Sequence, residues 1–159
     1  MRGFICQFAI FTILAGIIFS CDSSRMYDQY EQVEGSQWHK DSLVIFEVPV
    51  EDTVINYNMF LNIRNEVNYQ YSNLWLFIEI FQPDGSAVKD TFEIILADPS
   101  GKWLGKGLSG IRSSRTVYRR NVYFPSSGIY IIKIGHGMRP EVLKGIHDVG
   151  VRIEKAHPE

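Results

Sequence analysis

The chain has 159 residues, a formal net charge of −2 and two cysteines. This slightly acidic balance does not point to a nucleic acid as a partner. Cys6 lies in an N-terminal segment that we expect to be removed, so the mature chain would contain no disulfide. The roughly 140 residues that remain correspond to one domain, long enough to bury about two thirds of its unfolded surface.

The first 20 residues have the pattern of a secretory signal peptide. Residues 4–19 are almost continuously apolar after Arg2, and a polar segment follows Cys21. Ile18-Phe19-Ser20-Cys21 is similar to the lipobox of bacterial lipoproteins, although Phe19 departs from the usual residue types. An ordinary signal peptide and an uncleaved anchor are the alternatives, but an anchor usually needs about 20 apolar residues. We therefore expect residues 1–20 to be cleaved and Cys21 to be lipidated, which attaches the chain to a membrane.

Residues 21–37 are mostly polar, and we interpret them as the lipidated N-terminus followed by a tether. Fully extended, this segment would reach on the order of 50 Å. The folded domain is then expected to span residues 38–159.

Beyond the tether, apolar and polar residues alternate in several segments, which is the period of a strand with one buried face. The alternating apolar positions are Val44, Phe46, Val48 and Val50; Ile55, Tyr57, Met59, Leu61 and Ile63; Leu74, Leu76, Ile78 and Ile80; Phe92, Ile94 and Leu96; Tyr130, Ile132 and Ile134; and Val149, Val151 and Ile153. Turn residues such as Pro83-Asp84-Gly85 separate them. Seven or eight short strands predict an all-β fold, an antiparallel β-sandwich, in which Tyr130 is placed like a corner tyrosine.

The sequence lacks the motifs of common catalytic and binding sites. Ser109 is not in a Gly-x-Ser-x-Gly elbow, and Gly105-Lys106-Gly107 is not a phosphate-binding loop. Asp84 and Asp98 are interpreted as turn residues rather than calcium ligands. Four histidines without metal-ligand spacing are interpreted as surface or turn residues: His39, His136, His147 and His157.

Paired carboxylates for glycoside cleavage need only meet in space, so sequence spacing does not exclude them. Glu47, Glu79 and Glu93, however, lie in predicted strands at positions that face solvent. We therefore expect no enzyme activity, no metal, no cofactor and no small-molecule substrate.

Two features are candidates for contact with a partner. The first is a local group of arginines, interpreted either as a solvated hairpin or as a site for acidic groups: Arg112, Arg115, Arg119 and Arg120. The second is tryptophan. Trp75 lies on the second apolar face of its predicted strand, as expected of a central strand or of one covered by a partner. Trp103, in a glycine-rich stretch, looks more exposed; an exposed tryptophan can hold a sugar, although a tryptophan packed over an irregular loop is more common.

Several segments together resemble the gliding-motility lipoprotein GldH family of the Bacteroidetes. They include Trp38-His39-Lys40-Asp41-Ser42, Asp98-Pro99-Ser100-Gly101-Lys102-Trp103-Leu104-Gly105 and Gly145-Ile146-His147-Asp148-Val149-Gly150. The resemblance implies a lipid-anchored envelope protein without enzyme activity that supports the gliding machinery and its associated secretion apparatus. The partners implied are other envelope proteins of that machinery.

Lipoproteins of that phylum sent to the outer face often carry an acidic run after the cysteine. Asp22-Ser23-Ser24-Arg25-Met26 has none, so we expect a position on the outer membrane facing the periplasm. A glycan-binding envelope module is the alternative function.

Overall fold

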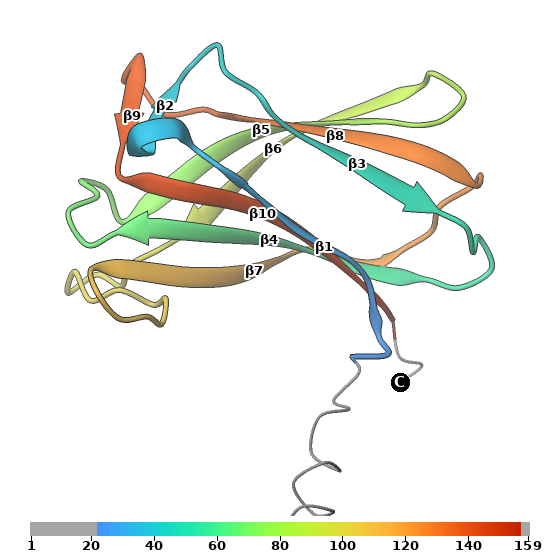
Figure 1. Cartoon of the computed structure of the whole chain (residues 1–159), viewed down its shortest axis with the longest axis horizontal. Coiled ribbons are helices and arrows are strands. Elements are labelled where there is room, and N and C mark those ends of the chain that lie inside the picture. The colour runs from blue at the N-terminus through green and yellow to red at the C-terminus, as the bar shows by residue number, and fades with distance from the viewer. Residues whose placement is uncertain (1–21, 157–159) are drawn as a thin grey trace, which may run out of the picture.

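The computed structural model describes residues 22–156, and within this range the chain is a β-sandwich (Figure 1). The elements are β1 (Arg25–Gln32), η1 (Glu34–Ser36), β2 (Gln37–His39), β3 (Val44–Val50), β4 (Tyr57–Glu66), β5 (Asn73–Phe81), β6 (Ala87–Ile95), β7 (Ile111–Val122), β8 (Gly128–His136), β9 (Val142–Lys144) and β10 (Ile146–Lys155). The prediction of an all-β antiparallel sandwich is confirmed.

Two four-stranded antiparallel sheets form the two layers. We call the sheet with strand order β1-β10-β4-β7 the first sheet, and the sheet with order β3-β8-β5-β6 the second sheet. A short pair, β2-β9, lies at one end. Eight strands therefore make the layers, in agreement with the predicted number, and two more make the short pair.

The core lies between the sheets and follows the alternation of the sequence. In β5, Leu74, Leu76 and Ile78 are at most 1% exposed. In β10, Val149, Val151 and Ile153 are equally buried, and these inward side chains meet across the two layers. Alternate side chains on each sheet point to opposite faces, so the period of two decides which residues enter the core.

The corner tyrosine is also confirmed. The hydroxyl of Tyr130 donates a hydrogen bond to the carbonyl of Ser126, with 3.0 Å between the oxygens. The ring is 2% exposed and lies edge-on to Phe124. This bond fixes the loop that enters β8.

The prediction of a tether over 21–37 is wrong for most of its length. Residues 25–32 form β1, an edge strand that pairs with β10 from Arg25↔Glu154 to Gln32↔Asp148. An edge strand has one neighbour and one side open to water, so its composition is more polar than that of a central strand. Met26 and Tyr27 nevertheless pack against the core, and Val33 is 6% exposed. The domain therefore begins well before residue 38.

The hairpin interpretation of the arginine segment is also wrong. Ile111–Val122 is one continuous strand of 12 residues, β7, at the other edge of the first sheet. Its register against β4 shifts around Met59, which changes the direction of the side chains that follow. This shift hides the alternation that would have marked the strand.

Candidate functional site

The four arginines of β7 do not form one basic surface. Arg119 pairs with Asp90 of β6 at 2.8 Å, and Arg115 donates to Asn62 Oδ1 at 3.2 Å. Arg112 donates to the carbonyl oxygens of Gly107 and Ile111. Three of the four guanidinium groups thus bind groups of the domain itself, while the side chains of Arg115 and Arg119 stay partly exposed.

The Arg119–Asp90 pair joins the two sheets along the edge where β6 and β7 lie. The hydrogen bond from Arg119 lowers the pKa of Asp90, and the hydroxyl of Tyr118 donates to the same carboxylate at 3.0 Å. Burial raises the pKa of Tyr118 to about 12, so this hydroxyl keeps its proton at neutral pH. The ion pair therefore links β6 of the second sheet to β7 of the first sheet.

Trp103 agrees with the second alternative from the sequence, a tryptophan packed over an irregular loop, and not with an exposed aromatic side chain. It is half-buried, and its backbone pairs with Ala97 in an isolated β-bridge. Its side chain packs against the core beside Tyr69, with 6.4 Å between the two ring centroids. The glycine-rich loop folds back onto the sandwich. Trp103 is therefore a packing residue, and a sugar would reach only part of its ring.

One of the histidines, His136, lies elsewhere than predicted. His136 is 1% exposed rather than a surface or turn residue; its ring lies edge-on to Trp38, and burial lowers its pKa. Asp148 lies inside β10, 6% exposed, and binds Arg64 at 3.3 Å. Asp84 and Asp98 are turn residues as predicted, since their carboxylates accept the backbone N–H groups of Ser86 and Ser100.

The outer face of the first sheet carries a layer of bonded polar side chains. At its centre is Arg152 of β10, which is 7% exposed although it is charged. Its guanidinium donates to three carboxylates, those of Asp22, Asp28 and Glu154. A buried cation needs such partners, because removing a charge from water costs several kcal/mol. Arg152 thereby binds the N-terminal segment and β1 to the rest of the sheet.

The same layer continues along the sheet towards β7. Arg64 lies over the ring of Tyr30, 4.3 Å from its centroid, while it binds Asp148. Gly150 leaves the room for that ring, because a Cβ there would come within 2.8 Å of Tyr30 Cδ1. Two buried polar atoms of this layer, Asp28 Oδ1 and Asn62 Nδ2, have no hydrogen-bond partner in the part of the chain that the structure describes.

The outer face of the second sheet is different, because large apolar side chains lie on it unbonded and exposed. Leu43, Ile45, Trp75 and Phe77 are 51%, 48%, 39% and 51% exposed, and we call these four residues the apolar patch. Exposed apolar side chains gathered on one face mark interaction surfaces in soluble proteins.

Two glycines create the floor of the apolar patch. A Cβ at Gly137 would lie 3.1 Å from Phe77 Cζ, and a Cβ at Gly135 would lie 3.0 Å from Leu43 Cδ2. Because both positions lack a side chain, the neighbouring apolar groups lie low over the sheet. Further along the same face, Lys133 lies 4.7 Å from the ring centroid of Phe81 and Lys89 binds Glu79, so polar groups border the patch.

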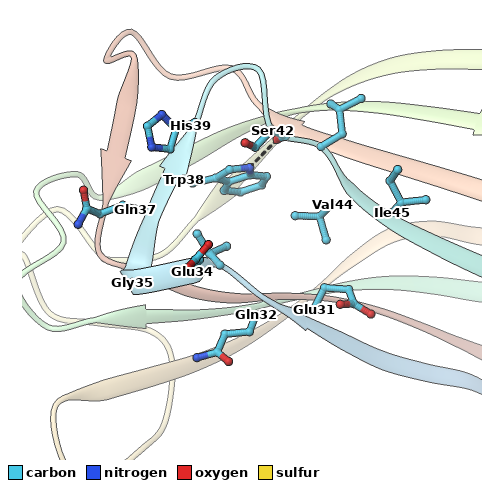
Figure 2. Close-up of a pocket in the computed structure, with 12 residues that line it drawn as sticks. Glu31, Gln32, Glu34, Gly35, Gln37, Trp38, His39, Ser42, Val44 and Ile45 are labelled. Carbon is cyan, nitrogen blue, oxygen red and sulfur yellow. Dashed lines mark hydrogen bonds between the residues drawn. The ribbon is translucent and has the colours of Figure 1, made fainter.

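A groove of about 760 Å³ runs beside the patch, where β1 and β3 separate at the open edge of the sandwich. Figure 2 shows Trp38 inside this edge, with its indole N–H directed at the carbonyl of Ser42, 2.9 Å away. Trp38 is 1% exposed, so it forms a wall of the groove rather than a contact surface. Leu43 and Ile45 line the groove as well, and the patch is therefore continuous with the groove around the edge strand β3.

Within residues 22–156, no three histidine, cysteine or acidic side chains are grouped so that they could hold a metal ion. The same range contains no helix of the length and apolarity needed to cross a membrane. Sequence reasoning noticed the second apolar face of β5 but missed Leu43, Ile45 and the glycine floor, since these come from other strands.

Comparison with known proteins gives close relatives over nearly the whole chain. The family model described as GldH lipoprotein matches residues 25–153. The gliding motility lipoprotein GldH homolog of Christiangramia forsetii is 44% identical over 154 residues, which cover 92% of this chain and 93% of that protein. The gliding motility lipoprotein GldH of Flavobacterium johnsoniae is 40% identical and covers 92% and 94%.

Solved structures show only distant likeness. A structure of infectious bursal disease virus, Gx strain, covers 85% of this chain and 30% of that chain at 11% identity and a TM-score of 0.34. Dimeric latent PorU from Porphyromonas gingivalis covers 86% and 14% at 9% identity, also with a TM-score of 0.34. At TM-scores this low, neither structure informs the function of the chain.

Proposed function

The chain belongs to the GldH lipoprotein family, and from this premise we propose that it is a non-catalytic envelope protein that supports the assembly or stability of the gliding-motility machinery and its associated secretion apparatus. Its activity would be to hold a binding surface at a membrane, with Cys21 as the lipidated residue. Cys21 and the proposed signal peptide lie outside the described residues. We place the protein on the outer membrane facing the periplasm, because residues 22–26 lack an acidic run.

The observation that carries the proposal is the apolar patch. Trp75 and Phe77 alternate with core residues of β5, so their exposure results from a second apolar face and not from poor packing. Interfaces between proteins are enriched in aromatic side chains at their centre, with a polar rim. The patch, bordered by Lys133 and by the Lys89–Glu79 pair, has this arrangement. A protein of the motility or secretion machinery is the proposed partner.

The test is site-specific photocrosslinking in living cells of the source bacterium. A photoreactive residue replaces Phe77 in the apolar patch or, as a matched control, Ser113, an exposed residue on the first sheet. We expect an envelope protein to be crosslinked from position 77 and not from position 113. Trp75→Ser should abolish the crosslink and lower surface delivery of secreted proteins. Equal crosslinking from both positions would refute the patch as the docking site.

Anchoring has its own test. Cys21→Ala should move the protein from membrane fractions to the soluble periplasmic fraction and lower function in the same assay. If the variant stays with the membranes, another anchor holds the chain.

A glycan remains the alternative ligand, because a sugar ring can stack on an exposed aromatic side chain. In the structure Trp75, and not Trp103, is the exposed tryptophan that suits this role. Specific binding on a glycan array that is lost in Trp75→Ser would favour this function over protein docking.

A further inference from the structure

The connection between the expected lipid and the folded domain is very short. Cys21 is followed by three residues, 22–24, before β1 begins at Arg25. Three extended residues reach only about 10 Å. Even these are held to the domain, because Asp22 binds Arg152 and the N–H of Lys155 donates to the carbonyl of Ser24 at 2.8 Å. The lipid would therefore emerge directly from one end of the sandwich.

The elements at this end are fixed by their mutual contacts. Tyr57, the first residue of β4, pairs with Lys155 near the end of β10 and with Val122 at the end of β7. The N–H of Ala156 donates to the carbonyl of Asn56 at 2.8 Å. Figure 1 shows the start of β1 and the end of β10 together at this end. The loops 51–56 and 123–127 belong to the same end, since they join these strands.

Two apolar side chains protrude here. Val54, at the tip of the loop between β3 and β4, is 88% exposed, and Tyr123, after β7, is 59% exposed. The N–H of Val54 donates to the carboxylate of Asp52, and the hydroxyl of Tyr57 donates to the carbonyl of Asp52, so the loop has a fixed shape. An isolated exposed valine is common on surfaces, but this one lies on the end from which the lipid leaves.

The charges at this end are mixed. Arg25, Arg120 and Lys155 are exposed, and so are Glu51 and Asp52. Such a surface gives no strong attraction to anionic lipids. The short connection therefore determines the contact, and the charge of the lipid contributes little.

We propose that this end of the sandwich rests directly on the membrane, with Val54 and Tyr123 at the lipid surface and no free tether. The proposal rests on the lipidation of Cys21 put forward above. It fixes the orientation of the domain. Phe81, at the end of β5, lies near the membrane end, and Trp75 lies six residues back along the strand, which places it about 20 Å farther from the membrane than Phe81. The apolar patch would then face sideways into the compartment, free to bind a protein.

The experiment measures the depth of labelled sites in the mature lipoprotein. Because Cys6 lies in the removed segment and Cys21 carries the lipid, one introduced cysteine is the only free thiol. Val54→Cys and Leu108→Cys are matched, because these side chains are 88% and 87% exposed and both lie in loops. Leu108 lies beyond the opposite end of the first sheet, where Ile111 pairs with Glu66, about 30 Å away along β4.

Each variant is labelled with an environment-sensitive dye and reconstituted into phosphatidylcholine vesicles that contain lipids with a headgroup nitroxide quencher. We expect severalfold stronger quenching at position 54 than at position 108, and the same ratio when part of the lipid is phosphatidylglycerol. Equal quenching at both positions, in protein that floats with the vesicles, would overturn the orientation. Protein that does not float would instead refute the lipidation, so the two failures are distinguishable.

A third variant tests the short connection. A ten-residue Gly-Ser insertion after Asp22 leaves Val54 and its loop unchanged but frees the domain from the lipid. We expect quenching at position 54 to fall towards that at position 108. Unchanged quenching would refute the assignment of the contact to the short connection.

Discussion

The outer faces of the two sheets differ in their side chains: the first carries hydrogen-bonded polar groups, and the second carries exposed apolar groups. On the first sheet, Arg152, Arg64 and Asn62 are bonded to neighbours within the domain, although the buried atoms Asn62 Nδ2 and Asp28 Oδ1 have no partner among residues 22–156. On the second sheet, Trp75 and Phe77 lie half exposed above a floor of glycine backbone. Antiparallel sheets often leave one face to water and fill it with polar groups. The second sheet departs from this pattern, and for this reason we propose its outer face as the docking surface.

The largest expected effect comes from removing the centre of the polar layer. Arg152→Ala leaves the carboxylates of Asp22, Asp28 and Glu154 without their shared cation, and breaking such a buried group costs about 3 kcal/mol. Urea unfolding should show this loss in the midpoint. Arg120→Ala, at an exposed arginine, should change stability by less than about 0.5 kcal/mol. Similar losses in both variants would mean that the layer does not hold the sheet together.

A smaller effect on folding is expected from the apolar patch. The double substitution Trp75→Ser and Phe77→Ser removes side chains that are already 39% and 51% exposed, so stability should fall by about 1 kcal/mol or less. Solubility should rise, because an exposed apolar surface is removed. The measurement is the urea midpoint together with the precipitation limit. A loss as large as that of Arg152→Ala would show that the patch belongs to the core.

The smallest effect concerns acid. The hydrogen bond from Ser24 and the bonds from Arg152 lower the pKa of Asp22 from 3.8 to about 2. A lowered carboxylate pKa means that the unfolded chain binds the proton first, so this contribution is complete above pH 4 and is lost as pH falls towards 2. The Lys155 amide donates to the carbonyl of Ser24, so its protection factor against hydrogen exchange should fall in that range. The protection factors of the β5 amides should stay unchanged. In Asp22→Asn this local step should disappear; if it persists, another group causes it.

The sequence predicted the fold because alternation marks strands that bury one face. β4, β5, β8 and β10 each bury one face, and their residues appear in the printed pattern. Of the four edge strands, β3 and β6 were predicted from their alternation, whereas β1 was interpreted as a tether and β7 as a hairpin. In β1 polar residues occupy most positions and none is fully buried, so the alternation is weak, and the register shift at Met59 obscures that of β7.

The contact residues were predicted less well than the strands, because residue type does not show which groups a side chain contacts. Arg112, Arg115 and Arg119 lie close together in sequence, but each binds a different group of the domain. Trp103 lies in a loop that folds back onto the core, whereas Trp75 is exposed. Only β5 gave a signal of the apolar patch, through its second apolar face.

The sequence by itself determined the family, the all-β class and the proposed lipid attachment at Cys21, because these depend on local pattern and order along the chain. Only the tertiary structure decided that residues 25–32 form a strand, that Arg152 binds it, and that Leu43, Trp75 and Phe77 share one exposed face. The physical reason is that burial and hydrogen bonding depend on strand neighbours, and these come from distant parts of the chain.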